Sequence, residues 1–449
     1  MVFTSTVFLF YFLPLALFYH ILPKNLRIRN FYLLILSLLF YAYGEGKNII
    51  LMLIAIATSH LAAIIIDKYP KYKKPALVGS LVIMLGQLMI FKYLGFFTSI
   101  LSRFANVPII HIALPIGISF FTFQAISYVV DVYRGHHPAR NVFDAALYVS
   151  LFPQLVAGPI VRYDTVENEL KNRTVTLDSF TEGLDRFLLG FSMKMLLSNQ
   201  FGKISDAAFS LNTYNSLYFM MALLGAIAYT LHIYYDFAAY SHMAIGLGKM
   251  FGFNFLENFN YPYISKSIKE FWSRWHISLS TYFRDYVYIP LGGSRCSTSR
   301  NIFNLLFVWF LTGLWHGAGF NFIAWGMYYA VLLLIERYVF KNKFQSHIIT
   351  MILVIIGWIF FRADGLRAAL SYLKSFTVFQ MPFAGRTWVY YILNFKLEWI
   401  FGLLFISPYI GKKISKRPVL KRVLLILLFM LSIVRLMTDG FNPFIYFRF

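Results

Sequence analysis

The stretch FYLLILSLLFYAYGEGKNIILMLIAIATSHLAAIII, residues 31–66, decides the class of the fold. It contains two apolar runs, 31–45 and 48–66, with only a short turn between them. An α-helix needs about 20 apolar residues to cross the hydrocarbon core of a bilayer. These runs therefore predict two membrane-spanning helices in succession.

The rest of the chain has the same character. Of its 449 residues, 59% are hydrophobic and 13% are charged, whereas soluble domains average about 25% charged residues. A soluble enzyme could not bury so much apolar surface, so we expect an all-α polytopic integral membrane protein with about 10–12 transmembrane helices. The remaining apolar runs are 5–23, 76–97, 109–132, 143–160, 187–200, 214–248, 302–316, 321–340, 347–361, 389–410 and 423–437.

The formal net charge of +22 comes from Lys and Arg residues that gather between the apolar runs. Such clusters indicate cytoplasmic loops beside anionic headgroups, so we expect membrane lipids and not nucleic acid as partners. Residues 411–422 carry six basic side chains and no acid. If they are cytoplasmic, one more crossing places the C-terminus outside. The single cysteine, Cys296, excludes an intrachain disulfide and a Cys-rich metal site.

Two apolar runs are interrupted where a straight helix would continue. The run 109–132 contains Pro-Ile-Gly, and the run 143–160 ends in Ala-Gly-Pro. At membrane depth such breaks are tolerated only where protein or a water-filled cavity covers the freed backbone groups. We therefore expect broken or re-entrant helices around a covered interior.

The first candidate for chemistry is His316, in LTGLWHGAGFNFIAWG (311–326). It lies in a glycine-rich break between two apolar runs, with no charged residue between Asn301 and Glu336. An ionisable group at membrane depth is costly and is usually functional. Imidazole suits general-base work near neutral pH. The alternative is a core histidine hydrogen-bonded to a neighbouring helix.

The second candidate is His276, in EFWSRWHISLSTYFRDYVYIPLGG (270–293). Basic and aromatic side chains alternate around it, as in a surface that binds phosphates and stacks on an adenine ring. A cytoplasmic amphipathic segment that binds lipid headgroups explains the pattern equally well. The side chains in question are Lys269, Trp272, Arg274, Trp275 and Arg284.

The third candidate is the pair His232 and Asp236, which are four residues apart and so share a helix face. A His/Asp metal site is the less favoured interpretation, and a buried structural pair is favoured; no metal is expected. The chain lacks a G-x-S-x-G elbow, a P-loop and an H-E-x-x-H motif. This disfavours a hydrolase and an ATP-driven pump.

Seven stretches together resemble the membrane-bound O-acyltransferase (MBOAT) family, in the bacterial branch of AlgI, PatA and DltB. They are VFLFYFLPL, LPIGISFFTFQAISYVVDVYRG, FPQLVAGPI, YYDFAAYSHMAIGLGKMFGF, ENFNYPYISKSIKEFWSRWHISLSTYFRDYVYIPLGG, GLWHGAGFNFIAWG and FFRAD. The resemblance implies a helical ring around a thin centre, where a cytoplasmic tunnel meets an outer funnel. The expected division of this single membrane domain (1–449) is N-terminal helices 1–110, a catalytic core 111–340, C-terminal helices 341–440 and a tail 441–449.

The resemblance also implies roles for particular residues. The essential family histidine falls on His316, and a second family position falls on His276. Trp315, Asn321, His232 and Asp236 are expected to support the site. Relatives commonly read YSDMAIG, whereas this chain has His242 at the Asp position, so the role of that acid is changed here or is taken by Asp236.

The C-terminal FIYFRF (444–449) resembles a short motif of the D-alanylation protein DltX and of some transferases in this branch. The resemblance implies that Tyr446 is a transient acyl carrier. A free phenol has a pKa near 10, so it would need a base such as His316. The alternative is that the aromatic tail only anchors the chain at the membrane interface.

The function that follows is acetyl transfer across the membrane. Acetyl-CoA is expected as the cytoplasmic donor, with no permanently bound cofactor. The acetyl group would reach an alginate-like polysaccharide or peptidoglycan through a separate extracytoplasmic, SGNH-hydrolase-like O-acetyltransferase. The expected location is the bacterial inner membrane. The alternatives are a transporter or channel with membrane-embedded His and Asp groups, a D-alanyl transferase of the DltB type, and a non-catalytic scaffold.

Overall fold

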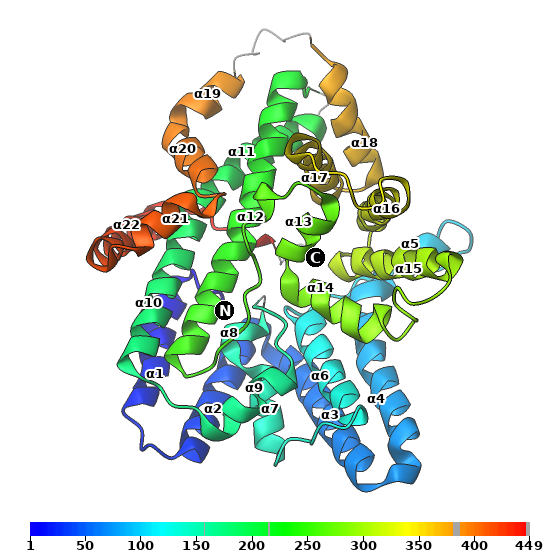
Figure 1. Cartoon of the computed structure of the whole chain (residues 1–449), viewed down its shortest axis with the longest axis vertical. Coiled ribbons are helices and arrows are strands. Elements are labelled where there is room, and N and C mark those ends of the chain that lie inside the picture. The colour runs from blue at the N-terminus through cyan, green and yellow to red at the C-terminus, as the bar shows by residue number, and fades with distance from the viewer. Residues whose placement is uncertain (157, 214–215, 380–386, 446–449) are drawn as a thin grey trace. The chain divides into compact units, whose positions relative to one another are not determined.

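The computed structural model describes residues 1–156, 158–213, 216–379 and 387–445, and over these ranges it contains helices and no strands (Figure 1). This confirms the all-α class. The chain forms two compact units. One consists of Met1–Phe187 with Ser241–Leu256, and the other of Leu188–Tyr240 with the residues from Glu257 onward. The ring, tunnel and funnel that the resemblance implies stay predictions.

The first unit is built around helix α3, which packs against α4 and α6. Its helices are α1 (Leu13–Leu17), α2 (Leu26–Glu45), α3 (Ile49–Lys68), α4 (Lys73–Leu88), α5 (Leu94–Leu101), α6 (Ile118–Tyr133), α7 (Val142–Ser150), α8 (Phe152–Leu155), α9 (Tyr163–Asn172), most of α10 (Leu177–Ser192) and the end of α12 (Phe219–Met250).

The predicted break in the run 109–132 is present, but the helix is shorter than predicted. Residues 109–115 have no helical structure, and α6 begins at Ile118. Gly117 has φ +78°, and a Cβ there would lie 3.0 Å from the backbone oxygen of Leu155. Only glycine suits this left-handed, crowded position. The first part of that predicted span was therefore wrong, because Pro115 and Gly117 start the helix late.

The second unit contains the histidines singled out above, apart from His242. A π-helical segment, Met193–Ser198, leads into α11 (Asn199–Thr213) and then α12. The further helices are α13 (Ile268–Arg274), α14 (Ile277–Phe283), α15 (Thr298–His316), α16 (Phe320–Leu334), α17 (His347–Arg362), α18 (Leu366–Lys374), α19 (Thr387–Asn394), α20 (Lys396–Leu404), α21 (Pro408–Ser415) and α22 (Pro418–Thr438).

Helices α15 and α16 pack closely because glycines line their interface. A Cβ on Gly313 would lie 2.5 Å from the backbone oxygen of Phe322, and one on Gly326 would collide with that of Trp309. Small residues let two helix backbones approach in this way inside membranes. The core beneath them is aromatic, and its fully buried side chains include Trp275, Trp325, Trp358 and Tyr329.

Several helices have the length and polarity of membrane spans. Within the described residues, three helical stretches are long and apolar enough: Leu26–Lys68, Pro70–Leu101 and Phe320–Val339. Shorter apolar helices are Phe8–His20, Ile118–Tyr133 and His347–Arg362. Helix α22 exposes an apolar stripe suited to lipid, formed by Val419, Val423, Ile426, Leu427, Met430, Val434 and Met437. The count of crossings stays a prediction, but the single span expected at 389–410 is wrong, since α19 and α20 divide it near Phe395.

Candidate active site

His316 ends helix α15 and is enclosed by aromatic rings. The residue is only 4% exposed. The imidazole centroid lies 4.9 Å from the rings of Trp315 and Trp325 and 5.0 Å from that of Phe361, each edge-on. Such packing fixes the imidazole plane and keeps bulk water away from it. The arrangement therefore suits a general base that must act in a dry environment.

His276 begins helix α14 with a left-handed backbone (φ +44°). Its Nδ1 lies 3.2 Å from Oδ1 of Asn258, and the same oxygen accepts the N–H of Ser278 at 3.1 Å. The residue is 1% exposed, and burial lowers the pKa of His276 to about 3. The imidazole is therefore neutral near pH 7 and acts through hydrogen bonds, not through charge.

Trp315 connects the two predicted site histidines. Its ring centroid lies 4.9 Å from that of His316 and 6.1 Å from that of His276. The structure therefore brings together His276, Trp315 and His316, which are as much as 40 residues apart in the chain. Both histidines press edge-on against one indole, so a change at Trp315 would disturb both.

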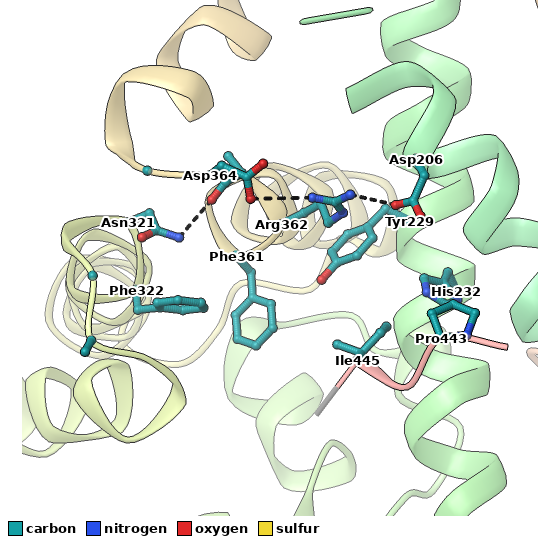
Figure 2. A pocket seen from close by; sticks show the side chains of 14 residues that line it. Asp206, Tyr229, His232, Asn321, Phe322, Phe361, Arg362, Asp364, Pro443 and Ile445 are labelled. Atoms are coloured by element: carbon teal, nitrogen blue, oxygen red, sulfur yellow. Dashed lines mark hydrogen bonds and ion pairs between the residues drawn. The ribbon is translucent and has the colours of Figure 1, made fainter. Parts of the chain in front are cut away.

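A cavity of about 170 Å³ lies beside this cluster (Figure 2). Phe361 lines the cavity and also contacts the His316 ring, which is itself not among the lining residues. The full lining is Asp206, Tyr229, His232, Ala318, Gly319, Asn321, Phe322, Phe361, Arg362, Ala363, Asp364, Gly365, Pro443 and Ile445. Figure 2 shows Asn321 and Phe322 on one side of it, with His232, Pro443 and Ile445 on the other.

The polar rim of the cavity is organised by Arg362. Its Nη2 donates to Oδ1 of Asp206 at 2.6 Å, its Nη1 lies 3.9 Å from Asp364, and its guanidinium covers the ring of Phe209 at 4.9 Å. Asn321 donates its side-chain N–H to the backbone oxygen of Ala363 at 3.0 Å. Asn321 thus holds the end of α17, which carries both Phe361 and Arg362.

His232 and Asp236 lie in one buried network on α12. Nδ1 of His232 is 2.8 Å from the backbone oxygen of Ser198, and the Ser198 hydroxyl donates to Asp236 at 3.2 Å. Asp236 forms an ion pair with Lys194 at 2.5 Å. The sequence analysis missed Lys194, although a lysine inside the apolar run 187–200 is a signal of function in a membrane protein.

The C-terminal tail reaches this network. Tyr446, the predicted acyl carrier, lies outside the described residues. Its neighbour Ile445 is described: its side chain lines the cavity, and its N–H donates to Asp236 at 3.0 Å. Phe444 packs on the ring of Tyr240 at 5.0 Å.

The aromatic and basic side chains of the predicted CoA-binding segment lie in different surroundings. Trp275 is 2% exposed and packs on Trp358, while Trp272 packs on Trp309 and Tyr329. The basic members lie at the surface: Arg274 pairs with Glu270 at 3.0 Å, Arg284 pairs with Asp285 at 2.6 Å, and Lys269 is exposed. The two indoles belong to the core, and phosphate binding by the basic side chains stays a prediction.

His242, at the position where the family resemblance implies an Asp, lies in the first unit. Its Nδ1 accepts a hydrogen bond from Nε of Arg186 at 3.1 Å. The imidazole must be unprotonated at Nδ1 to accept this bond. His242 therefore accepts from arginine without the negative charge of a carboxylate.

Known proteins resemble this chain over most of its length. A model of the membrane-bound O-acyltransferase family matches residues 139–363. The chain is 42% identical over 410 residues to the probable alginate O-acetylase AlgI of Pseudomonas aeruginosa, covering 88% of this chain and 77% of that protein. It is 33% identical over 420 residues to the peptidoglycan O-acetyltransferase of Helicobacter pylori, covering 84% and 79%. Over 235 residues it is 34% identical to the teichoic acid D-alanyltransferase of Bacillus subtilis, covering 49% and 58%. This chain therefore belongs to the membrane-bound O-acyltransferase family and is a membrane-embedded acyltransferase.

Proposed function

We propose that this protein takes acetyl groups from cytoplasmic acetyl-CoA and relays them across the bacterial inner membrane for O-acetylation of an extracytoplasmic polysaccharide. The names of the relatives that match most of the chain, an alginate O-acetylase and a peptidoglycan O-acetyltransferase, support an acetyl group and a saccharide acceptor. The observation that carries the proposal is the position of His316. It lies in an aromatic enclosure, separated by the ring of Phe361 from a cavity that both polar and apolar side chains line.

The chemistry is acyl transfer with His316 as general base. An acceptor hydroxyl that reaches the imidazole from the cavity side, past Phe361, gives its proton to the imidazole while its oxygen bonds to the thioester carbon. The C–S bond then breaks, and the proton passes from the imidazolium to the departing CoA thiolate. A positioned base contributes roughly 10²–10⁴-fold to such a step. The surrounding rings keep out water, which would otherwise hydrolyse the thioester.

In this proposal Tyr446 is the first acceptor. Its covalent neighbour Ile445 lines the cavity, which supports delivery of the phenol from the tail. A separate SGNH-hydrolase-like transferase outside the membrane then moves the acetyl group to the polysaccharide. On the expected cytoplasmic side, Lys269, Arg274 and Arg284 would offer positive charge to the phosphates of CoA, and lipid headgroups would compete for the same side chains.

Radiolabelled acetyl-CoA tests the proposal directly. We expect the purified protein to release free CoA and to retain acetyl label. Tyr446→Phe keeps the aromatic ring but removes the oxygen, so it should abolish the label on the protein and polymer O-acetylation in cells. Tyr409→Phe, at an exposed tyrosine of α21, is the matched control and should behave as the unaltered protein. Full O-acetylation with Tyr446→Phe would exclude the carrier, and no CoA release at all would exclude the donor.

D-alanyl transfer is the second candidate, because one relative over about half of the chain is a D-alanyltransferase. The two functions differ in their donors. A protein that accepts label from a D-alanyl carrier protein and none from acetyl-CoA would favour the second candidate. A transporter or channel would take an acyl group from neither donor.

A further inference from the structure

We propose that Lys194 and Asp236 form a buried clamp that holds the backbone of the C-terminal tail in the wall of the cavity, and that they are positioning residues for the acyl-transfer step. The tail segment is defined here as residues 439–445. The docking of the tail segment rests on its contacts with Lys194 and Asp236. Its consequence for catalysis rests on the proposed function of Tyr446.

The clamp grips two backbone groups of the tail segment. Oδ2 of Asp236 accepts the N–H of Ile445 at 3.0 Å. Nζ of Lys194 donates to the backbone oxygen of Pro443 and also pairs with Asp236 at 2.5 Å. One ion pair therefore satisfies an N–H and a C=O that lie two residues apart in the tail segment. Because both contacts are to backbone atoms, they fix the path of the chain and not the identity of a side chain.

The burial of the pair argues against a merely structural ion pair. The side chains of Lys194 and Asp236 are 3% and 0% exposed. Burying two charges costs free energy that their mutual attraction offsets only when further hydrogen bonds complete the geometry. Here the tail segment supplies those further bonds. The buried ion pair and the docked tail segment therefore stabilise each other.

A second row of contacts from α11 secures the start of the tail segment. Asp439 pairs with Lys203 and accepts from Gln200 at 3.3 Å, and Asn199 donates to Asn442 at 3.2 Å. Asn199, Gln200 and Lys203 lie at the start of α11, directly after the π-helical segment that carries Lys194. π-Helical turns redirect side chains and are frequent at functional sites.

The helix surface is also shaped to admit the tail segment. A Cβ on Gly202 would lie 3.0 Å from His232 and 3.1 Å from the ring of Phe441. Glycine at this position lets α11 lie close to both Phe441 of the tail segment and His232, which lines the cavity. Figure 2 shows Pro443 and Ile445 next to His232 at one wall. The clamp thereby sets the point from which residue 446 continues.

Cysteine accessibility tests the docking without any acyl chemistry. In a Cys296→Ser background, Ile445→Cys places the sole thiol at a position that is 5% exposed. We expect Lys194→Gln combined with Asp236→Asn to raise its rate of labelling by a polar maleimide at least about tenfold, since hydrogen bonds to charged groups are lost. Glu398→Gln is the matched control, because it breaks the ion pair with Arg435 on α22 and touches no clamp residue. If the Ile445→Cys protein is labelled at the same rate with and without the substitutions at Lys194 and Asp236, the clamp is overturned.

A pair of tail variants tests the effect on catalysis with the ion pair left intact. Ile445→Pro and Ile445→Ala both remove the apolar side chain, but only proline removes the N–H that Asp236 accepts. We expect Ile445→Pro to lower the single-turnover rate constant for acetyl transfer to the protein, at saturating acetyl-CoA, at least about tenfold relative to Ile445→Ala. The acetyl-CoA concentration that gives half of the maximal rate should stay unchanged. Equal rate constants, or a change confined to that concentration, overturn a positioning role.

The two proposals fail in different ways. Labelling of the Ile445→Cys protein does not require the phenol of Tyr446, so unchanged labelling rejects the clamp and leaves the carrier standing. If Tyr446→Phe retains full O-acetylation while the clamp variant exposes the thiol introduced by Ile445→Cys, the carrier is rejected and the clamp stands.

Discussion

Replacement of His316 by glutamine is the perturbation that separates catalysis from packing. The residue is 4% exposed, and three aromatic rings lie within 5.0 Å of its imidazole. Alanine at this position would leave a cavity, and large-to-small changes in cores cost about 2–5 kcal/mol of stability. Glutamine has a similar reach and stays polar, but it cannot take a proton from a hydroxyl.

The size of the expected effect follows from the surroundings of the imidazole. A positioned general base contributes about 10²–10⁴-fold, which is about 2.7–5.4 kcal/mol of barrier at about 1.36 kcal/mol per tenfold. Where water reaches a site, solvent can replace part of a missing base. The rings of Trp315, Trp325 and Phe361 restrict that route here. We therefore expect His316→Gln to lose about 10³–10⁴-fold, in the upper half of the range.

The assay is release of free CoA from acetyl-CoA by purified protein in detergent, under single-turnover conditions. His60→Gln is the matched control, because His60 is a second buried histidine, 6% exposed, whose Nδ1 lies 3.4 Å from the hydroxyl of Tyr128 in the first unit. The control should stay within about threefold of the unaltered protein, since it loses a packing contact and no base. If His316→Gln keeps more than about a tenth of the rate, the base is another group.

Two further predictions concern arginine partners. Asp206→Asn weakens the 2.6 Å contact to Arg362 and should destabilise the protein by about 2–3 kcal/mol. Glu398→Gln acts on a looser pair, whose 3.6 Å partner Arg435 is 46% exposed, and should cost under about 1 kcal/mol. Equal shifts of the thermal unfolding midpoint in detergent would contradict this. His242→Asp gives Arg186 a carboxylate in place of a neutral imidazole and should raise the unfolding midpoint, by about 0.5–1 kcal/mol of added stability; a lowered midpoint would show that the imidazole is required.

Local sequence patterns were enough to predict the class of the fold and to single out His316 as a candidate for chemistry. Hydropathy alone marks α2 and α3, because lipid-facing helices must be apolar over most of their length. Pro-Ile-Gly marks the break before α6, because the backbone at Gly117 is left-handed. His316 stands out because no charged residue lies between Asn301 and Glu336. Each of these signals lies within a short stretch of chain, about as long as one membrane-spanning helix of roughly 20 residues.

What the sequence could not predict depends on contacts between distant residues. Lys194 was visible in the run 187–200, yet its partner Pro443 lies 249 residues further along the chain. The residue spacing between Lys269 and Arg284 also left open which of the basic and aromatic side chains face the core. Helix α13 has seven residues and is followed by the left-handed His276, which redirects the chain. Trp275, which follows the last residue of α13, lies in the core, while Lys269, near the start of the same helix, stays at the surface. The alternating pattern of the sequence was therefore divided between the core and the surface.

The cavity is lined by apolar and polar side chains together, and the proposed relay requires both kinds. Phe361 and Phe322 form an apolar part of the lining, behind which the His316 ring packs. His232 and Arg362 form a polar part, and Pro443 and Ile445 of the tail segment line the cavity as well. A hydroxyl can approach through polar surroundings at little desolvation cost, while a thioester is protected from water only in apolar ones. A wholly polar lining would let water hydrolyse the donor, and a wholly apolar one would exclude the acceptor.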